Sequence, residues 1–472
     1  MIDFWATQFN KLRAKILPSK DSGSSEPLLR RSTTDDSSQF SDVYQDSYGI
    51  VYWVFFIYGI AMLLPWNVFI TASEYFAKRF QASEYDETFQ NYFSITFTVS
   101  NLLVFATILW RQSETTTFHI DVYLPVIINA IVFAVMCLTV QFGFSGTGYF
   151  WMILGLLVVT GASTSLFQAS VFAEASRFPY KYMQAVMSGQ GVAGVAVAVS
   201  SIVSALAGST TGTPDPSASA RSALIYFLSA FGITLAAFIG RLILSQQPFY
   251  THQIRKDVPS LSDDMEEEID ARDFLASEPP FSVMDTVRKS TGLIFAVGYI
   301  FMVTLAVFPS ITALIKSVRR HDPSGLATPN HNRFFDDDIF VAFHFLLFNV
   351  GDWVGRTMPI IDSLRTFNVK ALVTMSVART LFIPAFLLCN VVVSDDRRLP
   401  VLFGNDLAYF IIVWLFAVTN GWMGSLTMMA APQQSFIRTA TEKSVIGTVM
   451  SFSLVLGLAI GGGGSFFVRW LV

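Results

Sequence analysis

Three polar residues stand in line within an otherwise apolar stretch of the chain. Asn349, Asp352 and Arg356 are three and four residues apart, a spacing that places them on one face of a helix. A carboxylate accepts hydrogen bonds and a guanidinium donates them, so the pair could hold neighbouring hydroxyl groups of a ligand. The same pair could also be a buried clamp between helices, which contributes little net stability. In either case the charges must face the inside of the protein, because an unpaired charge in the middle of a membrane costs about 2.5 to 3.5 kcal/mol.

Other polar and aromatic residues occur within apolar stretches of the chain. They are Trp66, Asn67, Gln168, Gln190, Arg379 and Asn420. A single amide in such a place commonly forms a hydrogen bond between helices, and Arg379 could pair either with Asp352 or with another helix. Taken together, amide, carboxylate, guanidinium and aromatic groups also suit a ligand that joins a sugar diol to a flat heterocycle.

The elements that must position these residues are membrane-spanning helices. The 472 residues are 52% hydrophobic and only 14% charged, and apolar runs of about 20 residues, enough for one crossing, recur from residue 50 to the end. We predict an all-α polytopic membrane protein with eleven transmembrane helices. Their expected places are Asp46–Glu74, Glu87–Arg111, two within Asp121–Glu174 with a turn at 141–148, Met187–Gly208, Arg221–Arg241, Lys289–Lys316, 338–362, 370–393, Asp406–Arg438 and Lys443–Arg469.

The sequence also predicts how these helices are grouped. We expect a disordered cytosolic tail over 1–48, a six-helix bundle over 49–245, an acidic cytosolic linker over 246–287 and a five-helix bundle over 288–472. The longest connection carries the acidic run 262–268 and would divide the helices into six and five. Lys and Arg are more numerous on the side of the N-terminus, which predicts that the N-terminus is cytosolic.

Several classes of function are excluded by what the sequence lacks. The five histidines are scattered, and no motif of a hydrolase, metalloprotease or nucleotide-binding loop occurs, so we predict no enzyme, no cofactor and no metal site. The charge of −4 comes without a basic patch, so nucleic acid is not an expected partner. Cys137 and Cys389 lie within apolar runs and are interpreted as buried small residues.

The motifs of this chain resemble those of the equilibrative nucleoside transporters, solute carrier family 29, over nearly all of residues 50 to 472. The resemblance is carried by short motifs in the family's order. They are Leu-Leu-Pro-Trp-Asn at 63–67, Gln168 to Phe172, Pro179 with Met187 to Gly194, Phe348-Asn349 with Asp352-Trp353 and Gly355-Arg356, Ala378-Arg379 with Pro384, and Thr419-Asn420-Gly421 with Gly457-Leu458.

The resemblance implies a fold, a function and roles for particular residues. It implies a major-facilitator-like 6+5 arrangement and facilitated diffusion of nucleosides, such as adenosine or uridine, by alternating access in the lipid bilayer. Gln168 would contact the nucleobase, and Asp352 and Arg356 the ribose hydroxyls. Leu63, Trp66, Asn67 and Asn349 would complete the substrate site. Ile70 and Pro309 match the family's outer constriction, and Phe345 is assigned to the same gate.

Alternatives remain at this stage. Glu174 could form a salt bridge or, like His344, be a proton-sensitive group, so proton-assisted transport stays possible. The chain could instead carry nucleobases or another small polar solute, or be a nucleoside-binding receptor without flux. We expect a monomer. The sequence Glu26-Pro27-Leu28-Leu29 resembles an acidic dileucine sorting signal, which slightly favours a vacuolar or lysosomal membrane over the plasma membrane, although a chance match is the alternative.

Overall fold

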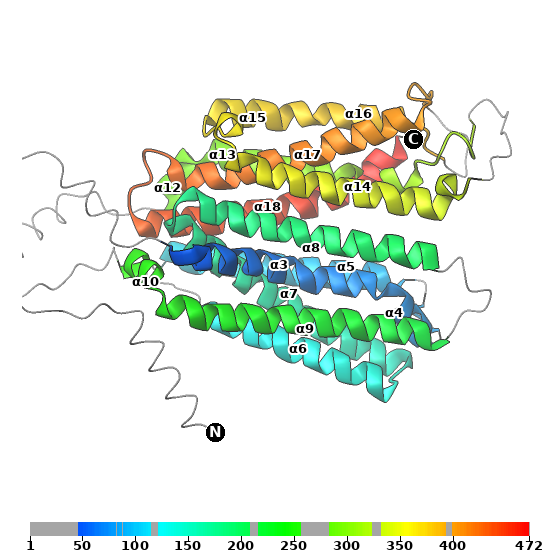
Figure 1. Cartoon of the computed structure of the whole chain (residues 1–472), viewed down its shortest axis with the longest axis horizontal. Coiled ribbons are helices and arrows are strands. Elements are labelled where there is room, and N and C mark those ends of the chain that lie inside the picture. Colours follow the sequence, from blue (N-terminus) through cyan, green and yellow to red (C-terminus); the bar gives the residue numbers. More distant parts are fainter. Residues whose placement is uncertain are drawn as a thin grey trace, which may run out of the picture. The chain divides into compact units, whose positions relative to one another are not determined.

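The chain is almost entirely helical in the residues that the structure describes. This computed structural model describes residues 46–471 apart from 82, 87, 115–120, 208–215, 256–282, 323–331 and 393–398. Figure 1 shows the long helices running next to one another. The described α-helices are α3 Ile50–Thr71, α4 Ser73–Phe80, α5 Phe89–Glu114, α6 Tyr123–Phe142, α7 Gly146–Arg177, α8 Tyr180–Ala207, α9 Pro216–Gln246, α10 Pro248–Arg255, α12 Val283–Lys289, α13 Thr291–Val307, α14 Asp337–Thr357, α15 Val369–Ala378, α16 Phe382–Leu387, α17 Asp406–Ala430 and α18 Ala440–Trp470.

The predicted number of membrane crossings is confirmed. Among the described residues, eleven helical segments are long and apolar enough to cross a membrane. Six of them lie within residues 47–246 and five within 291–470. We call these two sets of helices the N-half and the C-half.

Two of the predicted helix boundaries were wrong. The fifth span begins at Tyr180 rather than at Met187, because the helix continues past the apolar run into the polar residues at its end. The ninth span was expected to be continuous over 370–393. Instead, α15 ends at Ala378, a 3-10 turn follows over Arg379–Leu381, and α16 ends at Leu387. Pro384 lacks the N–H that a helix would direct at the carbonyl of Thr380, which explains the break.

The predicted tail and linker lie largely outside the described residues. Residues 1–45 of the tail and the acidic run 262–268 are among those not described. The two ends of the expected linker are helical, as α10 and α12. Two hydrogen bonds fasten α10 to the end of α7: Nε2 of Gln253 donates to the carbonyl oxygen of Arg177 at 2.9 Å, and Nη2 of Arg177 donates to that of Ile254 at 2.7 Å.

The two ends of the helices differ in how the N-half and the C-half pack. We call the end where α3 begins the Asp46 end, and the opposite one, where α3 finishes, the Ile70 end. Because successive spans alternate in direction, α10 and α12 lie at the Asp46 end and α4 lies at the Ile70 end (Figure 1).

At the Asp46 end the two halves share one hydrophobic cluster, which we call the shared cluster. It joins N-half residues such as Phe55, Phe172 and Phe178 to C-half residues such as Val297 and Met429. At the Ile70 end each half has a cluster of its own. The N-half cluster lies within residues 64–230 and the C-half cluster within 303–468. The described halves are therefore packed together at the Asp46 end and have separate cores at the Ile70 end.

Candidate functional site

The polar face predicted from the sequence lies on α14 and is buried. Asp337 and Asp338 stand in the first turn of the helix, where negative charge suits the positive end of the helix dipole. Asp352 and Arg356 are only 7% and 5% exposed. Nε of Arg356 donates to Oδ2 of Asp352 at 2.6 Å. Each charge thus has its partner on the same helix, as the four-residue spacing predicted.

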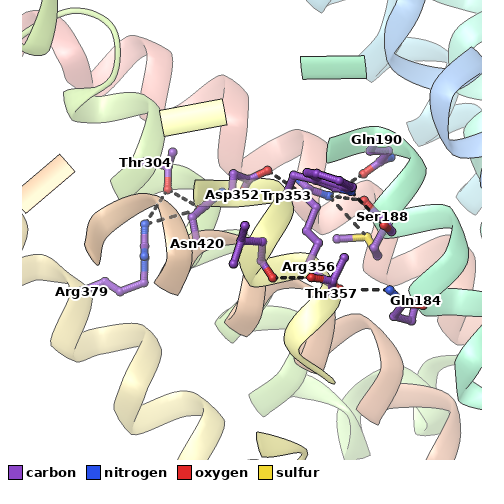
Figure 2. Close-up of polar contacts among 12 residues, drawn as sticks. Gln184, Ser188, Gln190, Thr304, Asp352, Trp353, Arg356, Thr357, Arg379 and Asn420 are labelled. Atoms are coloured by element: carbon purple, nitrogen blue, oxygen red, sulfur yellow. Dashed lines mark hydrogen bonds and ion pairs between the residues drawn. The ribbon is translucent and has the colours of Figure 1, made fainter. Parts of the chain in front are cut away.

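Arg356 also reaches across to the N-half. Its Nη1 donates to the carbonyl oxygen of Met187 and to Oε1 of Gln190, at 3.1 Å each. In return, Nε2 of Gln184 donates to the carbonyl oxygen of Arg356 at 3.3 Å. All three partners lie on α8, and Figure 2 shows Gln184 and Gln190 beside Arg356. The ion pair therefore stands where α8 of the N-half meets α14 of the C-half.

Within the C-half, Asp352 begins a chain of polar side chains that ends at Arg379. Nδ2 of Asn420 donates to Oδ1 of Asp352 at 2.7 Å, and Oγ1 of Thr304 donates to Oδ1 of Asn420 at 2.7 Å. Nη2 of Arg379 donates to Oγ1 of Thr304 at 2.9 Å. We call Arg379, Thr304 and Asn420 the relay; Figure 2 shows it beside Asp352. Of the two partners expected for Arg379, another helix is the direct one, because its Nη1 donates to the carbonyl oxygen of Phe416 on α17 at 3.0 Å.

A close approach of α14 and α17 brings Asn420 to Asp352. A Cβ atom placed on Gly421 would lie 1.9 Å from the carbonyl oxygen of Asp352, and one on Gly355 would lie 2.2 Å from that of Val418. These separations are too short for any side chain, so the two glycines allow backbone contact between the helices, as small residues do in membrane proteins. Since Asn420 directly precedes Gly421, its amide falls within hydrogen-bond distance of the carboxylate.

The structure places the other expected substrate residues on three helices. Asn349 lies on α14, where its Nδ2 donates to the carbonyl oxygen of Phe345 at 2.8 Å. Gln168 is buried within α7. Leu63, Trp66 and Asn67 are half-buried on α3. Within the described part of the chain, no hydrogen bond joins Gln168 or these three α3 residues to Asp352 or Arg356, so their role in a shared site stays a prediction.

Two contacts connect these helices indirectly. The ring of Trp66 stacks on that of Phe97, with centroids 4.9 Å apart. Nε2 of Gln190 donates to Sδ of Met62 at 2.8 Å. Gln190 also accepts a hydrogen bond from Arg356 and therefore links α3 to the ion pair. Its contact on α3, Met62, directly precedes the predicted substrate residue Leu63.

The residues assigned to the gate lie towards the Ile70 end. Ile70 is 50% exposed near the end of α3, and Pro309 is exposed just after α13. Phe345 packs against Phe308 with ring centroids 4.9 Å apart. Ile70 belongs to the N-half and the others to the C-half, and the constriction that they would form stays a prediction.

Both groups proposed as proton-sensitive are buried. Glu174 forms an ion pair with Arg241, with Oε1 and Nη1 2.7 Å apart. His344 is fully buried beside the rings of Phe308, Phe345 and Tyr409. Neither observation tests a proton-sensitive role.

The sequence did not point to several residues that hold the ion pair. Gln190 and Asn420 stood out as amides within apolar runs, but not as partners of Arg356 and Asp352. Gln184 lies before the predicted start of its helix, and Thr304 carried no signal because threonine hydroxyls commonly bond their own helix. Indeed, Oγ1 of Thr304 also lies 2.8 Å from the carbonyl oxygen of Ile300.

Two solved structures resemble this chain in the arrangement of their helices. A bacterial homologue of the iron transporter ferroportin, in an outward-facing state, aligns with a TM-score of 0.50 and 10% identity, over 88% of this chain and 92% of its own. A proton:xylose symporter of the major facilitator superfamily, bound to 6-bromo-6-deoxy-D-glucose, aligns with a TM-score of 0.50 and 12% identity, over 90% and 88%. The fold is thus the major-facilitator-like arrangement expected from the sequence.

Sequence comparisons give the family. The model of the nucleoside transporter family matches residues 154–470. Equilibrative nucleoside transporter 1 of Rattus norvegicus is 28% identical over 91% of this chain and 98% of its own, and equilibrative nucleoside transporter 2 of Homo sapiens is 27% identical over 91% and 99%. Equilibrative nucleotide transporter 1 of Arabidopsis thaliana is 26% identical over 88% and 85%.

This chain belongs to the nucleoside transporter family. It is a multi-pass integral membrane protein and a membrane nucleoside transporter rather than an enzyme. The resemblance inferred from the motifs is confirmed.

Proposed function

We propose that this protein carries nucleosides such as adenosine and uridine by alternating access and holds the ribose hydroxyls between Asp352 and Arg356. The observation that carries this proposal is the place of the buried ion pair, at the contact between one helix of each half. A ligand bound there would contact both halves at once. Its binding would therefore be sensitive to how the halves are arranged, which alternating access requires.

The ion pair retains the capacity to bind a ligand. Oδ1 of Asp352 accepts from Asn420 and Oδ2 accepts from Arg356, but a carboxylate offers about four acceptor positions. On Arg356, Nε and Nη1 are engaged, and among the described residues none accepts a hydrogen bond from Nη2. A ribose diol could donate to the carboxylate and accept from Nη2 without breaking the pair.

We propose that the two halves move as units, corresponding to the bundles 49–245 and 288–472. The shared cluster at the Asp46 end and the separate clusters at the Ile70 end support this, because they describe halves that meet at one end only. When the halves rock, the Asp46 end would separate, and Ile70, Pro309 and Phe345 would come together as the constriction.

The nucleobase would lie on the side of the N-half, towards Gln168, Leu63, Trp66 and Asn67. The stack of Trp66 on Phe97 supports a rigid aromatic wall there, because the ring is held by its neighbour. Asn349 would lie above the ribose, one helical turn from Asp352. The monomer expected from the sequence would contain both halves and so a complete site.

We propose that transport is passive. Glu174 is paired with Arg241 inside the N-half, and His344 is enclosed by aromatic rings of the C-half. Both arrangements favour structural roles. The membrane would be vacuolar or lysosomal if the dileucine-like sequence at residues 26–29, which lies outside the described residues, acts as a sorting signal.

Uptake of radiolabelled uridine into liposomes containing the purified protein tests the proposal. We expect the wild type to take up uridine. In Arg356→Ala the rate of uridine uptake should fall about a hundredfold, because removing one partner of a buried charge pair costs about 2 to 5 kcal/mol. Arg469→Ala is the matched control, since Arg469 is exposed at the end of α18, and should behave as wild type. Elution of each variant as a single species shows that it is folded.

Other outcomes would contradict the proposal in distinct ways. Equal uptake by Arg356→Ala would contradict the site. Uptake of labelled uracil without uptake of uridine would indicate a nucleobase carrier. Specific binding of uridine without flux would indicate a receptor.

A further inference from the structure

Arg379 carries a buried positive charge without a carboxylate in contact. It is 2% exposed, and none of the ion pairs among the described residues includes it. Its guanidinium is held by neutral acceptors and lies over the ring of Phe416, 4.6 Å from the centroid. Burial of such a charge is costly, so its place beside the binding site calls for a function.

The hydrogen-bond polarity of the relay gives Arg379 such a function. A guanidinium only donates, so the groups that face it must present acceptors. Oδ1 of Asn420 faces Nη2 of Arg379 at 3.5 Å and accepts from Thr304. The Nδ2 group of Asn420 is thereby directed at Oδ1 of Asp352. The reversed amide would set an oxygen against the carboxylate and an NH₂ group against the cation, which is unfavourable at both ends.

The orientation of Asn420 in turn fixes Asp352. One carboxylate oxygen accepts from Asn420 and the other from Arg356, so the plane of the group is set from two sides. The acceptor positions left over then point in fixed directions. Without the donor-only cation at the far end of the relay, the amide could rotate and the second restraint on the carboxylate would be lost.

We propose that Arg379 is a positioning residue that acts through Thr304 and Asn420 to aim the Asp352 carboxylate at the ribose hydroxyls. Discrimination between ribose and deoxyribose nucleosides then depends on a side chain that does not touch the substrate. This inference rests on the proposed function, because it takes Asp352 as the group that recognises ribose.

The test compares uptake of uridine with uptake of 2′,3′-dideoxyuridine, which lacks both hydroxyls. We expect wild-type protein in liposomes to prefer uridine. In Arg379→Gln, whose amide both donates and accepts, the KM of uridine should rise towards that of the dideoxy compound. The preference should fall about tenfold, the size expected for losing a charge-assisted hydrogen bond. A loss of packing alone would slow both substrates equally and leave their ratio unchanged.

Two further variants complete the design. Ser376→Ala is the matched control: Ser376 is buried on α15, close to Arg379, but donates only to the carbonyl oxygen of Leu372, so the preference should stay at the wild-type value. Thr304→Val removes the hydroxyl link with little change of shape. It should also lower the preference, and it provides the test if Arg379→Gln does not fold.

The outcomes separate the two proposals. A wild type that prefers uridine, together with Arg379→Gln and Thr304→Val variants that keep the full preference, would overturn the relay alone. A wild type that takes up both compounds equally would overturn ribose recognition by Asp352, and the relay with it.

Discussion

Two buried ion pairs of this protein have nearly the same length and different surroundings. In the C-half, Nε of Arg356 lies 2.6 Å from Oδ2 of Asp352 on the same helix. In the N-half, Nη1 of Arg241 lies 2.7 Å from Oε1 of Glu174 on another helix. The first pair bonds across to the other half and stands next to a relay of polar side chains. Among the described residues, the second contacts only the N-half and α10, which directly follows it.

The contacts of Arg241 are typical of a residue that stabilises the fold rather than of one that binds a ligand. Its guanidinium lies 3.7 Å from Asp121 and over the rings of Tyr123 and Tyr250, 5.5 and 5.6 Å from their centroids. Tyr250 belongs to α10, so this pair helps to hold the helix from which the linker starts. Burial and pairing are common to both sites, whereas a position between the halves distinguishes the pair that we assign to transport.

The largest difference is expected when the same charge is removed from each pair. Asp352→Asn should lower uridine uptake by about a hundredfold, because the Arg356 charge is left buried without its partner. Glu174→Gln should leave uptake within about threefold of wild type and lower the thermal stability of the purified protein, since the pair supports packing inside one half. Uptake and thermal unfolding, measured on the same preparations, check both statements.

The opposite pattern would contradict the roles that we assign to the two ion pairs. If Glu174→Gln abolished uptake of a stable protein, Glu174 would take part in transport. If it removed a dependence of uptake on pH that the wild type shows, the proposal of passive transport would be contradicted as well.

An intermediate effect is expected from crowding the contact between the halves. A Cβ atom on Gly191 of α8 would lie 3.0 Å from the Cα atom of Trp353 and 3.0 Å from Cδ of Arg356. Gly191→Val should therefore lower uptake about tenfold, the effect of roughly 1 to 3 kcal/mol of overpacking. The folded yield should change little, because the halves also separate during transport.

Gly421→Val is the matched variant inside the C-half. Its side chain would collide with the backbone of Asp352, so we expect little folded protein. Similar yields for the two valine variants would show that the contact between halves is no easier to open than the packing within one.

The smallest effect is expected from single indole hydrogen bonds. Nε1 of Trp353 donates to Oγ of Ser188 across the halves at 3.3 Å, and Nε1 of Trp422 donates to the carbonyl oxygen of Leu364 within the C-half at 2.9 Å. Trp353→Phe should change the maximal uptake rate about two- to threefold, as expected for one neutral hydrogen bond. Trp422→Phe should lower thermal stability and leave the rate unchanged; a change of rate in Trp422→Phe alone would contradict the comparison.

Much of the fold could be predicted from the sequence, because the composition and length of a single segment are enough to identify a membrane helix. Each apolar run of sufficient length predicts one crossing, and the number of eleven was predicted correctly, although the bounds of the fifth and ninth spans were wrong. The break in the ninth span was missed although Pro384 was visible, because a proline kinks some membrane helices and only bends others slightly, depending on the neighbours that satisfy the freed carbonyl.

The sequence alone determined the ion pair, since Asp352 and Arg356 lie one helical turn apart and that distance is set by the geometry of a single helix. The motifs likewise determined the family. The tertiary structure is needed to show which helices meet. Gln190 and Met187 lie far from Arg356 along the chain, and Asn420 reaches Asp352 because Gly421 lets two backbones touch. Contacts of this kind arise from the packing of whole helices, so they cannot be predicted from the pattern of residue types within one segment.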